Sequence, residues 1–172
     1  ATFLELALRF SDTSDGCRNW LVGHKDELSL VAAAMIKTID CQENTLPGEN
    51  VNDFLSIAHY GYAVKYLMDN SEVNMGLRAA IGLKKAGLIE TPSNLDALLS
   101  GNTAGIIGLY NESNANYDYA KANPSTWIKF YPDATAQLYP CLFGAVPADD
   151  PRSKSVYEKF NSVFPDWPAG KA

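Results

Sequence analysis

The order of apolar and polar residues along the chain predicts a succession of helices. Between Phe3 and Phe10, apolar side chains surround the polar Glu5 and Arg9, as in a short buried helix. From about residue 25 to 39, acidic residues precede an apolar run, and acids in a first turn suit the positive end of the helix dipole. The segment from residue 11 to 16 is rich in turn-forming residues and is expected to be a loop.

The middle of the chain predicts three further helices. Asp53 can cap a helix that ends near Tyr66. A second helix is expected from Asp69 to Lys85, with Gly87 in the left-handed position that commonly closes a helix. A third begins at residues 92–94 and is expected to stop near residue 101.

The last third of the chain combines an irregular segment with two helices. Residues 102–131 mix turn formers with aromatic residues, which favours a long loop or a short irregular hairpin, mainly over 105–131. Asp133 then opens an apolar helix in which Pro140 is expected to force a kink, and residues 153–164 form an amphipathic helix. The chain is therefore predicted to be all-α: a single helical domain over residues 1–172, built from stacked helical hairpins.

Composition and charge narrow the classes of function. The chain of 172 residues is 47% hydrophobic and 20% charged, as expected for one globular domain. A net charge of −6 without a basic run argues against nucleic-acid binding. No apolar run approaches the roughly 18 residues of a membrane span. Glu5 and Arg9 interrupt what could be a signal peptide, but a mature secreted or periplasmic chain would look the same, so the localisation stays open.

The cysteines and histidines do not point to a cofactor. Cys17, Cys41 and Cys141 form no Cys-x-x-Cys pair and no Cys/His cluster, so we expect no metal site and no cofactor. They allow one disulfide at most, and buried reduced thiols are the favoured alternative. His24 and His59 are the only histidines, and no nucleophile elbow supports a Ser/His/Asp triad.

Two acidic clusters fall at predicted helix starts. Asp69 and Glu72 are three residues apart and therefore share nearly the same helix face, with the hydrogen-bonding Asn70 beside them. Asp133 stands at another helix start, and Gln137 follows four residues later on the same face. The alternative for both clusters is helix capping, with Asp69 at the N-cap and Glu72 in the third position of a capping box.

Aromatic residues surround both acidic clusters. Trp127 and Tyr131 belong to an aromatic segment rich in asparagine and serine, and His59 and Tyr60 precede Asp69. Aromatic faces among amides and carboxylates suit a sugar, whose C–H faces stack and whose hydroxyls form hydrogen bonds. Core packing is the alternative for each ring, and a structural role is the alternative for the histidine.

Two stretches, residues 59–72 (His-Tyr-Gly-Tyr-Ala to Tyr-Leu-Met-Asp-Asn-Ser-Glu) and 127–140 (Trp-Ile-Lys-Phe-Tyr-Pro-Asp-Ala-Thr-Ala-Gln-Leu-Tyr-Pro), resemble the six-hairpin glycosidase superfamily. More narrowly, most of residues 25–167 resembles the C-terminal half of uncharacterised bacterial members. That family folds as an (α/α)6 toroid with its substrate cleft at one end of the ring. The resemblance implies about half of such a toroid, which a second chain, a second copy or further sequence would complete.

The resemblance and the acidic clusters together predict a glycoside hydrolase that acts on an oligo- or polysaccharide by carboxylate acid/base chemistry. Asp69 and Asp133 are the expected catalytic residues, and the expected substrate-binding residues are Asn70, Glu72, His59, Tyr60, Trp127, Tyr131 and Gln137. The alternative functions are a non-catalytic helical domain that binds glycan or a partner chain, and an incomplete half of a glycosidase.

Overall fold

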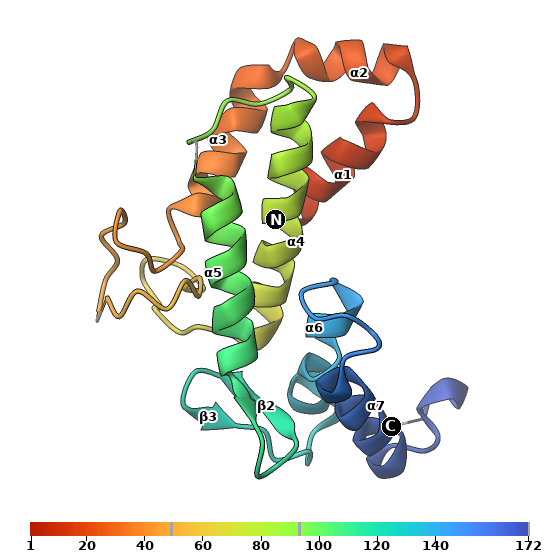
Figure 1. Ribbon diagram of the computed structural model, residues 1–172. Helices are drawn as coiled ribbons and strands as arrows, with labels where there is room; N and C mark the ends of the chain where they lie inside the picture. The colour runs from red at the N-terminus through yellow and green to blue at the C-terminus, as the bar shows by residue number, and fades with distance from the viewer. Residues whose placement is uncertain (49, 93, 172) are drawn as a thin grey trace.

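The computed structural model describes residues 1–48, 50–92 and 94–171 (Figure 1). About half of the described chain is helical, and a small antiparallel sheet accompanies the helices, so the all-α prediction is matched only in part. The helices are α1 (Thr2–Ser11), α2 (Asp15–Val22), α3 (Lys25–Ile36), α4 (Leu67–Lys85), α5 (Leu95–Gly108), α6 (Tyr139–Leu142) and α7 (Pro151–Val163). The strands β1 (Tyr110–Asn111), β2 (Asn116–Ala120) and β3 (Asn123–Pro124) pair in that order.

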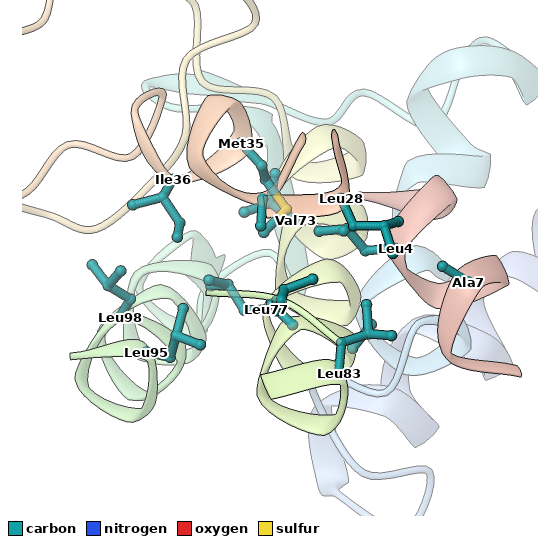
Figure 2. Packing of buried hydrophobic residues seen from close by; sticks show 14 of the residues in the cluster. Leu4, Ala7, Leu28, Met35, Ile36, Val73, Leu77, Leu83, Leu95 and Leu98 are labelled. Atoms are coloured by element: carbon teal, nitrogen blue, oxygen red, sulfur yellow. The ribbon is translucent and has the colours of Figure 1, made fainter. Parts of the chain in front are cut away.

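The long helix α4 runs through the centre of the molecule and contacts both α1 and α5 (Figure 1). Leucines of α4 pack against α1, α3 and α5 in one hydrophobic cluster (Figure 2). Leu77 and Leu83 are fully buried there, beside Leu4 of α1. Helices α1, α3, α4 and α7 thus form where the apolar pattern predicted them. Helix α1 is not the buried helix that was expected, because Phe3 is 53% and Leu6 63% exposed.

A second cluster lies at the other end of α4, where the sheet and α7 pack. Leu67, the first residue of α4, meets Ile106 near the end of α5. Tyr117 of β2 and Phe160 of α7 are each only 1% exposed in the same cluster. The start of α4 is therefore held between helices and sheet, which fixes the side chains that project from its first turn.

The predicted helix from residue 53 to 66 is wrong, because this segment is extended. The Asp40 N–H donates to the Leu55 carbonyl at 2.9 Å, and the Phe54 N–H donates to the Asp40 carbonyl at 2.8 Å. The Asp53 carboxylate, expected to cap a helix, binds the Lys65 ammonium at 2.7 Å. Distant partners thus satisfy the backbone groups that a helix would have paired internally.

The helix expected to open at Asp133 is also wrong. Tyr131 is extended (φ −123°, ψ 138°), a short helical turn follows it as far as residue 136, and after a break at residues 137–138 the helix α6 begins afresh at Tyr139. Pro140 lies in the first turn of α6, where a backbone N–H would have no helical partner, so the missing N–H of proline costs no hydrogen bond. Pro140 therefore belongs to the start of a helix and does not kink one. The expected loop over 11–16 contains the start of α2, whose N-cap Ser14 accepts a hydrogen bond from the Cys17 N–H.

Helix α5 continues to Gly108, well past the predicted stop near residue 101, while its start at Leu95 follows residues 92–94 as expected. Residue 93 lies outside the described residues. Gly87 has a φ of +75° after α4, which confirms its predicted place at the helix end.

Candidate functional site

A cavity of about 290 Å3 opens at the start of α4. Its lining comes from three parts of the chain: the start of α4, strand β2, and residues 131–136. Tyr66 pairs with Ala120 as an isolated bridge, which brings β2 beside the start of α4. The lining residues are Tyr66, Met68, Asp69, Tyr119, Tyr131, Pro132 and Ala136, and we call this space the tyrosine cavity.

Asp69 is the acidic group of the tyrosine cavity. It is the third residue of α4, and the helix N-cap is Tyr66, whose side chain makes no capping bond. The capping-box alternative is therefore wrong for Asp69 and Glu72. Burial raises the pKa of the Asp69 carboxyl, and among the described residues no group donates a hydrogen bond to it. An acid with a raised pKa and no structural partner is available for a ligand.

Glu72 lies one turn further along α4 and is coupled to Asp69 by charge. Burial raises the pKa of the Glu72 carboxyl, and the neighbouring Asp69 raises it further. The phenol of Tyr139 in α6 has a raised pKa because of burial first and then the charges of Glu72 and Tyr131. Two acids on one helix face are thus both partly buried, and the charge of Asp69 disfavours ionisation of Glu72, while the ammonium of the chain's N-terminus favours it.

The tyrosines of the cavity differ in how firmly they are held. The Tyr66 hydroxyl lies 3.1 Å from the Tyr62 hydroxyl. Tyr131 is 67% exposed, so much of this side chain is open to solvent at the cavity wall. Exposed tyrosine rings beside a carboxylate offer both a stacking surface and hydrogen-bonding groups to a ligand.

Asp133 is buried and fully engaged, unlike Asp69. Its Oδ1 accepts a hydrogen bond from the Ser125 hydroxyl, and its Oδ2 accepts two from Thr126, from the N–H at 3.0 Å and from the hydroxyl at 2.8 Å. Asp133 does not line the tyrosine cavity, although its neighbour Pro132 does. These bonds hold the turn that carries Tyr131 against the segment that follows β3.

Asn70 and Gln137 are fully buried and bind the protein's own backbone. The Asn70 side chain accepts from the Ser56 N–H at 2.6 Å and donates to the Ser56 carbonyl at 3.1 Å. Gln137 likewise accepts from the Tyr117 N–H at 2.7 Å and donates to its carbonyl at 3.0 Å. Both amides therefore hold neighbouring segments to the site and leave no free group for a substrate.

The remaining predicted binding residues lie outside the tyrosine cavity. Trp127 is buried in the second hydrophobic cluster, with its ring 6.5 Å from that of Phe160. Tyr60 is half exposed and donates through its hydroxyl to the Lys37 carbonyl at 3.1 Å. His59 is exposed, and its ring centroid lies 6.1 Å from that of Tyr62.

Of the site residues predicted from the sequence, Asp69 and Tyr131 line the cavity, whereas five lining residues were not predicted: Tyr66, Met68, Tyr119, Pro132 and Ala136. Tyr66 immediately precedes α4, so its nearness to Asp69 in the sequence was a usable signal. Met68 was also close in sequence, but its type resembles core packing. Tyr119 carried no such signal, because only the pairing of β2 with residue 66 brings it to the cavity.

Comparison of the chain with protein-family models, with curated protein sequences and with solved structures gave no significant match. Within residues 1–48, 50–92 and 94–171, no group of three or more potential metal-binding His, Cys, Asp or Glu side chains occurs. None of the described helices is both long and apolar enough to cross a membrane.

Proposed function

We propose that the tyrosine cavity binds a sugar ring and that the chain is a carbohydrate-active protein that hydrolyses a glycosidic bond in an oligo- or polysaccharide. One observation carries the proposal: the Asp69 carboxyl, without a hydrogen-bond partner among the described residues, stands in a cavity walled by Tyr66, Tyr119 and Tyr131. Aromatic faces can stack on the C–H faces of a sugar, and a carboxylate can bind its hydroxyls or act in hydrolysis.

The proposed chemistry uses Asp69 and Glu72 as the pair of carboxyl groups. Glycoside hydrolysis needs one protonated carboxyl to donate to the leaving oxygen and one ionised carboxylate to assist water or attack the sugar. Burial raises the pKa of both carboxyls, and the charge of Asp69 raises the pKa of Glu72 further, so both accept a proton more readily than free carboxyls do. Asp69 lines the cavity and is assigned the contact with the sugar.

Asp133 receives a positioning role in this proposal. Its oxygens already accept hydrogen bonds from Ser125 and Thr126, so it supports the turn beneath Tyr131. We also propose that the described helices form about half of an (α/α)6 toroid. Helices α4 and α5 run in opposite directions side by side, as the two helices of one hairpin would (Figure 1).

A second candidate function is glycan binding without hydrolysis. It is favoured by one observation: Asp69 is the only carboxylate among the described residues that line the tyrosine cavity. A binding module needs the tyrosines and a single acceptor, whereas a hydrolase also needs Glu72 to reach the same sugar.

The test measures release of reducing sugar from a panel of polysaccharides by the wild-type chain, Asp69→Asn and Glu72→Gln. Loss of an acid or base lowers hydrolysis by about 100-fold or more. Asp118→Asn is the matched control, because burial also raises the pKa of this carboxyl but it lines a different cavity. Its activity is expected to equal that of wild type.

Three results decide between the candidates. Binding of a polysaccharide without product release by the wild-type chain supports the glycan-binding function. Neither binding nor release across the panel refutes both functions. If Glu72→Gln keeps the hydrolysis of wild type while Asp69→Asn loses it, the assignment of Glu72 as the second carboxyl is refuted.

A further inference from the structure

The segment before α4 forms a small β-hairpin beside the tyrosine cavity. The Ala58 N–H donates to the Val64 carbonyl at 2.8 Å, and His59 and Tyr62 exchange backbone bonds of 3.3 and 2.8 Å. Residues directly opposite each other in an antiparallel pair project their side chains from the same face. His59 and Tyr62 therefore stand side by side, with ring centroids 6.1 Å apart.

The rings of this hairpin continue the wall of the tyrosine cavity outward. The Tyr62 ring lies 6.3 Å from the Tyr66 ring, which itself lines the cavity. The ring planes of His59 and Tyr62 are inclined to each other by 36°, and those of Tyr62 and Tyr66 by 37°. Neighbouring rings are therefore tilted and do not meet edge to face. We call His59, Tyr62 and Tyr66 the aromatic row.

The outer part of the aromatic row does not serve the core. Tyr62 is 50% exposed, and the His59 side chain is exposed as well. Neither residue belongs to the two hydrophobic clusters of the described chain. By contrast, the Trp127 and Phe160 rings pack inside the second cluster. Exposed rings next to a cavity form an open stacking surface.

The hairpin holds this surface in place without a ligand. The Tyr60 hydroxyl at the tip donates to the Lys37 carbonyl at 3.1 Å, and the Gly61 N–H donates to His59 Nδ1 at 3.0 Å. A side chain on Gly61 would approach the His59 ring to 3.1 Å, so glycine keeps the tip compact. A surface that is ordered beforehand loses less conformational entropy when it binds.

We propose that the aromatic row is a second subsite, which stacks the sugar residues adjoining the one in the tyrosine cavity. This inference rests on the proposed function of the cavity and names its substrate class as an oligosaccharide chain and not a monosaccharide. The row leads from the cavity to solvent, so a chain can extend along it without meeting a closed end. Tyr62 is the residue that decides the preference for longer chains.

The experiment measures KM and kcat on cello-, malto- and chito-oligosaccharides of two to four sugars; binding affinity replaces KM if no product is released. In the wild-type chain, KM falls by about 3- to 10-fold from disaccharide to tetrasaccharide, the range for one or two added aromatic contacts. Tyr62→Ala abolishes this gain, whereas Tyr62→Phe keeps most of it, because the ring remains and only the hydroxyl is lost.

Tyr157→Ala is the matched control, since Tyr157 is 52% exposed on α7 and lies outside both the cavity lining and the aromatic row. It leaves the dependence on chain length unchanged. A dependence that persists in Tyr62→Ala, or one that is absent from the wild-type chain, overturns the second subsite while the proposed function stands. No binding or hydrolysis of any oligosaccharide overturns the proposed function itself, and the subsite falls with it.

Discussion

Gly105 of α5 is a position where a single added methyl group would collide with the backbone of another segment. A Cβ at this residue would lie 2.5 Å from the Asp53 carbonyl oxygen and 3.0 Å from Leu55 Cδ2. An ordinary carbon–oxygen contact is about 3.3 Å or longer, so the two backbones would have to separate by about 0.8 Å. The segment from 53 to 55 cannot yield easily, because its backbone is bonded to Asp40 on the far side.

The expected effect of Gly105→Ala is the difference between two opposing contributions. Overpacking costs about 1–3 kcal/mol, while alanine in a helix gains roughly 0.5–1 kcal/mol over glycine. The free energy of unfolding should therefore fall by about 1–2 kcal/mol, which lowers Tm by roughly 2–8 °C for a chain of this size. Urea and thermal unfolding followed by far-UV circular dichroism measure both quantities.

Gly108→Ala is the control for this prediction. Gly108 lies on the same helix, three residues further on, and a Cβ there would meet nothing within 4 Å. This variant should be as stable as wild type or more stable by about 0.5 kcal/mol, since only the propensity gain applies. If Gly105→Ala proves as stable as Gly108→Ala, the close approach of the 53–55 segment to α5 is refuted.

Two further predictions concern buried carboxylates. Burial alone would raise the pKa of Asp40, but bonds from Lys65 and from the Val51 and Asn52 N–H groups hold it below its ordinary value. Its stabilising contribution is therefore present above about pH 4 and is lost as pH falls through the lowered pKa, so Asp40→Asn should flatten the acid limb of stability against pH. Asp133→Asn weakens the bonds from Ser125 and Thr126 and should lower the free energy of unfolding by about 1–3 kcal/mol, measured by urea unfolding.

The helices were predictable wherever one regular face is buried. In α1, Leu4 and Ala7 are buried, as the periodicity indicated, and in α7 Val156 and Phe160 are. The same reasoning failed for residues 53–66, whose apolar positions suit either a helix or an extended segment in contact with a core. The extended conformation is selected by hydrogen bonds to Asp40, which is distant in the sequence. The apolar pattern of residues 53–66 contains no information about such partners.

The sequence predicted only those residues of the candidate site that neighbouring acids and aromatic residues single out. Asp69 and Tyr131 were selected because acids and aromatic rings cluster near them, and both line the cavity. Asp133 gave the same local signal, yet its carboxylate is occupied by Ser125 and Thr126, which a search for acids beside aromatic rings does not test. Asp69 and Asp133 therefore differ in their hydrogen-bond partners and not in residue type, and only Asp69 is available to a ligand.

The extended segment 53–66, which was predicted to be a helix, carries part of the proposed sugar site. The Lys65 ammonium, in a side chain 8% exposed, binds Asp40 at 2.5 Å and Asp53 at 2.7 Å. These pairs fix the chain on both sides of the hairpin that carries Tyr62, immediately before Tyr66 opens α4. In a continuous helix over 53–66, residues 59, 62 and 66 would also share one face, since side chains three and four apart do so. The extended segment differs in how it is anchored: the ion pairs of Lys65 and the bond from the Tyr60 hydroxyl to the Lys37 carbonyl fix the hairpin, so Tyr62 is held beside Tyr66 at the cavity that Asp69 lines.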